Sequence, residues 1–190
     1  MKMIVIRHGE TALNVDGRMQ GSRGPNEPLT ENGRAQITHL RDTLLISPDT
    51  IYVSPLLRAM ETAQILNERF HSELVERNEL IERDFGSLSG QPHDSISPEI
   101  HERDLELRYD YHPFGGESVD DVRKRTLDFL KTLALSEDKT VFVVTHRGVI
   151  RILYELYPNA VTAEEIIPGS KHVFHIDALP AVSADKKSPA

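Results

Sequence analysis

Short apolar runs recur along this chain, between longer stretches in which apolar positions repeat with a helical period. Short runs rich in β-branched residues are typical of buried strands. Three runs have this character, at residues 3–6, 50–53 and 141–144. Residues 172–176 form a weaker fourth run, which we place at an edge of the sheet, and residues 74–75 predict one more short strand.

Helical patterns fill the intervals, over residues 30–45, 54–70, 118–133 and 148–157. Thr30 is a candidate cap for the first helix, and Ser54 followed by Pro55 is a candidate cap for the second. Ser118 with Asp121 resembles a capping box at the start of the third. Strands that alternate with helices predict an α/β fold, a three-layer sandwich in which helices flank a mainly parallel central sheet.

The length of 190 residues suits one domain with one core. We place this domain at residues 1–180, and we expect the small, polar residues 181–190 to form a disordered tail. The stretch from Gly86 to Gly116 interrupts the alternation of strands and helices. It is polar and contains several prolines and glycines, so it predicts an excursion that could cover a site.

Composition narrows the classes of function. The net charge of −8 disfavours general nucleic-acid binding, and no apolar stretch approaches the length of a membrane span. Cysteine is absent, which excludes disulfides, thiolate metal sites and a cysteine nucleophile. The first apolar run is too short for a signal peptide, and we expect a cytoplasmic protein, as a monomer or a homodimer.

Cationic and imidazole side chains follow three of the predicted strands, at the point where each strand ends. They are Arg7 and His8 after the first, Arg58 in the helix after the second, and His146 and Arg147 after the third. In open α/β sheets, ligands bind beyond the carboxyl ends of the strands. In an acidic protein, this convergence of positive groups predicts a phosphate site.

The residues around these side chains form an ordered set of motifs. In chain order they are RHGET at 7–11, QG at 20–21, PLT at 28–30, SPLLRA at 54–59, LIERDFG at 80–86, GGES at 115–118 and VTH at 144–146. The set resembles the histidine phosphatase superfamily, which includes the cofactor-dependent phosphoglycerate mutases, and it spans nearly the whole chain. The resemblance implies a phosphoglycerate mutase-like fold and phosphoryl transfer through a phosphorylated histidine.

The expected nucleophile is His8. A neutral imidazole can attack phosphorus when an acceptor, often a backbone carbonyl, holds its other nitrogen. Arg7 and Arg58 would hold the phosphoryl oxygens with charge-assisted hydrogen bonds. His146 would donate to them if protonated, and Asn14 would add one more hydrogen bond. Because these groups supply the charge, we expect no metal and no cofactor.

Glu82 is the candidate general acid. It would protonate the leaving alcohol and then activate water against the phosphohistidine. Without the resemblance, an ordinary surface glutamate near Glu76 and Glu79 would be the simpler interpretation. Glu10 lies beside the nucleophile and is as well suited to orienting its loop as to acting as the acid.

One departure from the family pattern concerns the substrate. The family usually has glycine directly after its second histidine, where this chain has Arg147. Arg147 is therefore a candidate substrate-binding residue, which could contact an acidic substrate or point away from the site.

Three functions fit the motifs. We expect a phosphatase that acts on a small phosphorylated metabolite, because the mutases of the family are longer and must exclude water. A cofactor-dependent phosphoglycerate mutase is the alternative, since Glu82 followed by Arg83 looks mutase-like. A non-catalytic protein that binds a phosphorylated ligand is the third. It is disfavoured because His8, Glu82 and His146 are all present.

Overall fold

A computed structural model of the chain describes residues 1–158 and 165–180. Its centre is a five-stranded sheet in the order β3-β2-β4-β1-β5. The strands are β1 Lys2–Arg7, β2 Thr50–Val53, β3 Glu73–Glu76, β4 Thr140–Thr145 and β5 Lys171–His175. The first four strands pair in parallel, and β5 pairs antiparallel with β1 at one edge. The predicted strands and the mainly parallel sheet are therefore confirmed.

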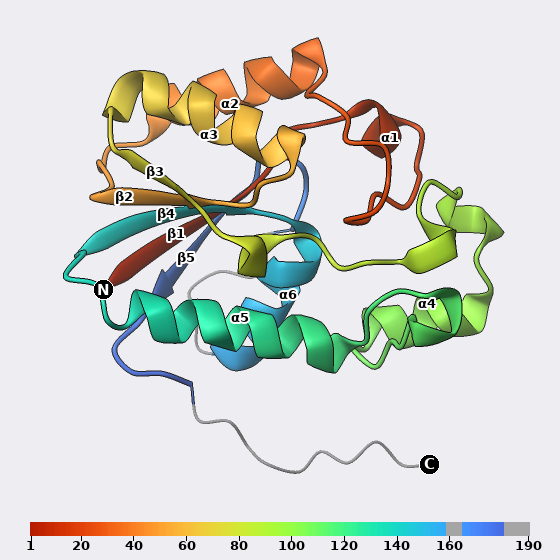
Figure 1. Ribbon diagram of the computed structural model, residues 1–190. Helices are drawn as coiled ribbons and strands as arrows, with labels where there is room; N and C mark the ends of the chain where they lie inside the picture. Colours follow the sequence, from red (N-terminus) through yellow and green to blue (C-terminus); the bar gives the residue numbers. More distant parts are fainter. Residues whose placement is uncertain (159–164, 181–190) are drawn as a thin grey trace.

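Helices cover both faces of the sheet, which gives the expected three layers (Figure 1). The helices α2 Glu31–Thr43 and α3 Leu57–Phe70 lie on one face, and α5 Val119–Leu133 and α6 Arg147–Leu156 lie on the other. Successive residues of a strand point to opposite faces. Accordingly Met3 and Val5 pack with the side of α5 and α6, whereas Ile4 and Ile6 pack with the side of α2 and α3. A sheet covered on both faces explains why its strands are continuous apolar runs.

Two of the predicted helix starts are confirmed and one is wrong. The Thr30 hydroxyl accepts a hydrogen bond from the Gly33 amide at 2.9 Å, and Ser118 with Asp121 forms the predicted capping box. Ser54 does not cap the second helix, because α3 begins only at Leu57 and has no side-chain cap. The Ser54 hydroxyl is instead engaged by a distant side chain of the site.

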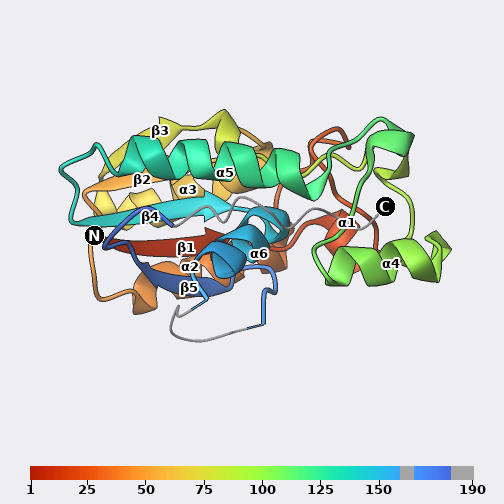
Figure 2. The same ribbon diagram turned by 90° about the horizontal axis from the view of Figure 1, so that it is seen from below.

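The remaining helices lie beyond the carboxyl ends of the parallel strands (Figure 2). They are α1 Ala12–Val15, α4 Pro98–Leu105, and 3₁₀ turns at Asn78–Leu80, Gly86–Leu88, His93–Ser95 and His112–Phe114. The predicted excursion thus contains a short helix and several turns. Two side chains of this excursion, Tyr109 and Tyr111, form a separate apolar cluster with Met19 and Phe85.

The sequence also led to expectations about membrane spans and about the end of the chain. In the described ranges, no helix is both long and apolar enough to cross a membrane. The expected tail at 181–190 lies outside the described residues.

Candidate active site

A cavity of about 360 Å³ opens at the carboxyl ends of the parallel strands, which is large enough for a small organic ligand. Five of the seven predicted site residues line it: Arg7, His8, Asn14, Glu82 and Arg147. The other two, Arg58 and His146, are buried behind its wall, with 1% and 0% of their surface exposed. The structure therefore brings all seven residues to one end of the sheet.

His8 is held in the orientation that a nucleophile requires. Its Nδ1 lies 2.8 Å from the carbonyl oxygen of Gly9. Because a carbonyl can only accept, Nδ1 carries the proton and the lone pair is on Nε2. Burial lowers the pKa of His8 well below its usual value, and the charges of Arg58 and Arg7 lower it further. The imidazole is therefore neutral at physiological pH, with Nε2 free to attack.

Three backbone contacts fix the position of this ring. The amide of His8 donates to the carbonyl of Thr145 at 3.0 Å, and the carbonyl of His8 accepts from the amide of Gly169 at 3.0 Å. The next amide, that of Gly9, donates to the hydroxyl of Thr62 on α3 at 3.1 Å. The candidate nucleophile is thus tied to β4, to the segment before β5 and to α3.

Arg7 and Arg58 remain charged although both are buried. Burial lowers the pKa of each to about 10, against the opposing effect of the Glu82 carboxylate. Arg7 donates one hydrogen bond to the carbonyl of Ile166 at 2.8 Å, and Arg58 donates one to the carbonyl of Gly21 at 3.3 Å. The Nε–H of each is buried and has no partner in the described part of the chain. These unpaired donors suit an anionic ligand.

His146 lies next to His8, with 5.1 Å between the ring centroids. Its Nε2 lies 2.8 Å from the hydroxyl oxygen of Ser54. Burial, and then the charge of Arg58, lowers the pKa of His146 well below its usual value. The neutral ring is therefore favoured over the protonated one considered from the sequence. Its Nδ1 is buried without a partner among the described residues. When the Ser54 hydroxyl donates its proton to Nε2, the neutral ring carries its own proton on Nδ1, and this N–H is free to donate to a ligand.

Glu82 lies in the cavity lining and is fixed by two backbone amides. Its Oε1 accepts from the amide of Arg83 at 2.8 Å and from the amide of Gly148 at 3.1 Å. A Cβ on Gly148 would collide with the same carboxylate oxygen. The close approach of Glu82 to the start of α6 therefore requires glycine at this position.

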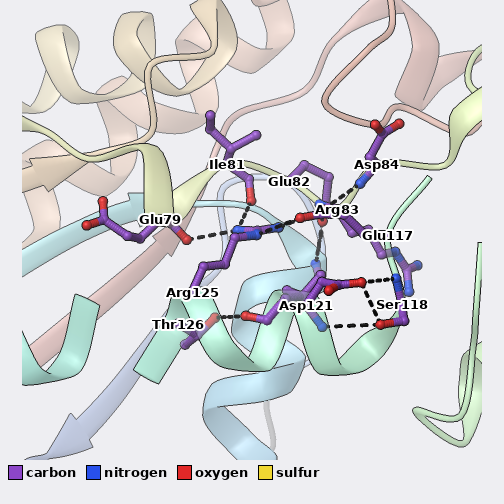
Figure 3. Close-up of polar contacts among 12 residues, drawn as sticks. Glu79, Ile81, Glu82, Arg83, Asp84, Glu117, Ser118, Asp121, Arg125 and Thr126 are labelled. Carbon is purple, nitrogen blue, oxygen red and sulfur yellow. Dashed lines mark hydrogen bonds and ion pairs between the residues drawn. The ribbon is translucent and has the colours of Figure 1, made fainter. Parts of the chain in front are cut away.

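Arg125 clamps the segment that carries this carboxylate (Figure 3). From α5 it donates to the carbonyls of Glu79 and Ile81, and its Nε donates to Glu117 at 3.1 Å. Glu117 in turn accepts from the amide of Asp84 at 2.9 Å. The GGES motif of the sequence thus serves to hold the backbone on both sides of the candidate acid.

Two side chains offer amide donors to the cavity. The Asn14 side-chain oxygen accepts from the backbone amide of Thr11 at 3.2 Å, which leaves its NH₂ group for a ligand. Gln20 has the same arrangement: its oxygen accepts from the Thr11 hydroxyl at 2.9 Å, and its buried Nε2 has no partner in the ranges described. The sequence marked Gln20 only as part of a motif, so motif reasoning missed its place in the lining.

Other candidates lie apart from the reacting groups. The Glu10 carboxylate accepts from the hydroxyl of Thr30 at 2.7 Å and from the side-chain NH₂ of Asn32 at 3.0 Å, so it orients its loop. Arg83 is buried, pairs with Asp104 and stacks on Phe85, with 4.7 Å from the guanidinium carbon to the ring centroid. Its charge is thus committed within the protein.

Comparison with known proteins agrees with these observations. The model of the histidine phosphatase superfamily (branch 1) matches residues 3–165. The chain is 33% identical to a metal-independent phosphoserine phosphatase of Arabidopsis thaliana, over 92% of this chain and 76% of that protein. It is 28% identical to a 2,3-bisphosphoglycerate-dependent phosphoglycerate mutase of Azorhizobium caulinodans, over 95% of each. Among solved structures, TTHB049 from Thermus thermophilus matches with a TM-score of 0.76 and 32% identity, over 93% of this chain and 95% of that one.

Proposed function

Because the chain belongs to the histidine phosphatase superfamily, we propose that it is a metal-independent phosphatase that hydrolyses a phosphomonoester through a phosphohistidine on His8. The observation that carries the proposal is the hydrogen bond from His8 Nδ1–H to the Gly9 carbonyl, which leaves Nε2 unprotonated in the cavity. The substrate is a small phosphorylated metabolite, and the enzyme acts in the cytoplasm.

In the first step, the Nε2 lone pair of His8 forms a bond to phosphorus while the ester P–O bond breaks. The electron pair of that bond leaves on the alcohol oxygen, which takes a proton from the Glu82 carboxyl. The products of this step are a phosphohistidine, a free alcohol and a Glu82 carboxylate.

In the second step, water attacks phosphorus from the side opposite His8. Glu82 accepts one proton of the water, the new O–P bond forms, and the N–P bond breaks with its electron pair returning to Nε2. Inorganic phosphate leaves, the imidazole is neutral again, and Glu82 holds the proton that it will donate to the next leaving group.

Buried cations and fixed donors stabilise the phosphoryl oxygens during both steps. Arg7 and Arg58 supply full positive charges, and Nδ1–H of His146 and the NH₂ of Asn14 supply hydrogen bonds. Such groups are oriented before the reaction, so they need little rearrangement as negative charge develops.

The test measures release of inorganic phosphate from p-nitrophenyl phosphate and 3-phosphoglycerate in excess EDTA. The parent should turn over at least one ester, and His8→Ala should release none. When the reaction of the Glu82→Gln variant is rapidly quenched, mass spectrometry should find one phosphoryl group on the peptide that contains His8. Conversion of 3-phosphoglycerate to 2-phosphoglycerate with a bisphosphate primer, in place of phosphate release, would establish the mutase alternative instead.

A further inference from the structure

The cavity holds more positive charge than a single phosphoryl group uses. Its lining contains five arginines: Arg7, Arg18, Arg83, Arg147 and Arg151. Arg7 belongs to the phosphoryl site. Arg83 and Arg151 both pair with the single buried carboxylate of Asp104, Arg151 at 3.0 Å, so both guanidinium groups have an ion-pair partner within the protein and one of their two charges is neutralised. Arg147 and Arg18 remain as cations that face the cavity without such a partner in the described part of the chain.

Arg147 lies beside the phosphoryl site. It is the first residue of α6 and directly follows His146, and its side chain is half-buried. This side chain forms no hydrogen bond and no ion pair with any residue in the described ranges. Its charge nevertheless reaches the nucleophile end of the cavity, because Arg147 contributes to the lowered pKa of Arg7 after the larger effect of burial. A half-buried guanidinium with several unused donors is costly unless an anion occupies the space beside it.

Two neighbours define the outer part of the cavity around Arg147. Arg18 is exposed and is oriented by a 2.9 Å hydrogen bond from its Nη1 to the carbonyl of Gly90. His93 lines the same wall, and burial together with the charge of Arg147 lowers its pKa, which keeps its ring neutral. The carboxylate of Glu165 also lies in the lining. Among the residues that the structure describes, it forms no ion pair with Arg147 or Arg18.

On the basis of the proposed phosphatase function, we propose that Arg147 and Arg18 form a second anion subsite, and that the substrate is a small phosphomonoester with a further anionic group. The phosphoryl group lies against Arg7 and His8, and the second group, a carboxylate or another phosphate, lies against Arg147. The volume of about 360 Å³ accommodates both groups and a short carbon chain between them. Arg147 stands where the family usually has glycine, so a relative with the usual glycine has no side chain at this position to form the contact.

A matched pair of esters tests the subsite. D-3-Phosphoglycerate and sn-glycerol 1-phosphate share one carbon skeleton and the same configuration at C2, and they differ only in that the first has a carboxylate where the second has a hydroxymethyl group. The parent should have a kcat/KM about 10- to 100-fold higher for the carboxylate ester, which is the range expected for a charge-assisted contact. Arg147→Gln should reduce this ratio about tenfold or more, and Arg147→Lys should restore part of it. Glycerol 1,3-bisphosphate in the same assay distinguishes a second phosphate from a carboxylate as the preferred group.

Arg103→Gln is the matched control. Arg103 is an exposed arginine of α4 that does not line the cavity, so its loss changes the net charge equally without touching the subsite. An equal fall of the ratio in Arg103→Gln and Arg147→Gln would overturn the proposal, because a general field would then explain the preference. An equal kcat/KM of the parent for all three esters would overturn it as well, while the phosphatase function would stand.

A binding measurement separates this proposal from the proposed function. In His8→Ala, no ester is turned over, so calorimetry gives the affinity directly. We expect tighter binding of D-3-phosphoglycerate than of sn-glycerol 1-phosphate, and loss of the difference when Arg147→Gln is added. If the parent hydrolyses no ester but this difference is found, the phosphatase function fails and the subsite stands. If the two esters bind equally, the subsite is wrong regardless of turnover.

Discussion

The hydroxyl oxygen of Ser54 lies 2.8 Å from Nε2 of His146, although the two residues are 92 positions apart. Both side chains are fully buried. The Ser54 oxygen also accepts from the amide of Leu56 at 3.4 Å, so its hydroxyl proton is available to His146. We infer that Ser54 donates to Nε2, which places the proton of the neutral ring on Nδ1, on the side without a partner among the described residues.

Ser54→Ala should lower kcat about tenfold with little change in KM, because the hydrogen bond is worth about 1 to 1.5 kcal/mol and acts through the tautomer of His146. Nitrogen NMR of the labelled imidazoles should show a mixture of tautomers for His146 in the variant and one tautomer in the parent. Ser72→Ala is the control, since Ser72 lies just beyond the carboxyl end of α3 and its hydroxyl donates to the backbone carbonyl of Pro48. An unchanged tautomer in Ser54→Ala would contradict this role.

Arg125→Gln should reduce kcat about tenfold or more by releasing the backbone of Glu79 and Ile81, which the guanidinium now bridges. The expected signature is a fall in kcat with KM nearly constant, and a changed pH profile for the proton-transfer steps. Arg123→Gln removes a cation from the same helix, where it pairs with Glu155 on the surface, and should leave the profile as it is. Equal effects of both substitutions would show that only the stability of α5 matters.

Gly148→Ala should lower kcat about 100-fold, because the new methyl group collides with the Glu82 carboxylate and a misplacement of about 1 Å costs that much. Gly24→Ala is the matched change, since a Cβ there meets no atom within 4 Å. Thermal unfolding of both variants checks that the loss comes from the site. Full activity of Gly148→Ala would show that Glu82 does not need its present position.

Stability should fall as the pH falls from about 6.5 toward 4. Burial lowers the pKa of His172 to about 4, and burial lowers the pKa of His8 and of His146 in the same direction. Above about 6.5, these rings are neutral in both the folded and the unfolded state. Below it, only the unfolded chain takes up the protons, so acid favours unfolding.

His172→Gln tests this dependence by thermal unfolding between about pH 7.5 and 4.5, a range that brackets the ordinary histidine pKa. The variant should lose less stability over this range than the parent, because one of the three buried rings is gone. The exposed ring of His39 offers the comparison, and His39→Gln should follow the parent curve. An equal loss of stability in His172→Gln and in the parent would mean that other groups cause the destabilisation in acid.

The regular elements were predictable because their signals are local. The continuous apolar run at residues 3–6 and the caps at Thr30 and Ser118 each involve neighbours in the chain. The ordered motifs also brought the candidate nucleophile, both cations and the carboxylate to the correct end of the sheet. These side chains follow strand ends or open helices, and parallel strands deliver such positions to one edge.

The polar partnerships of the site could not be predicted, because they join residues that are distant in the sequence. Ser54 followed by Pro55 has the local pattern of a helix cap, yet the Ser54 hydroxyl forms a hydrogen bond with His146. Likewise nothing near Asp104 in the sequence indicates that it pairs with both Arg83 and Arg151. That pairing is what leaves Arg147 as the uncommitted cation, so the charge balance of the cavity is a property of the fold alone.

The contact between the amide of Gly169 and the carbonyl of His8 has a consequence for the order of events during synthesis. His8 precedes Gly169 by some 160 positions, so the amide that holds the candidate nucleophile is made much later. A second late contact, from the amide of Arg7 to the carbonyl of Ser170 at 3.0 Å, joins the same two regions. Domains fold as units as they emerge from the ribosome, so a nascent chain that ends before Gly169 has the candidate nucleophile without this support. The proposed catalytic site is therefore complete only once the segment that leads into β5 has been translated.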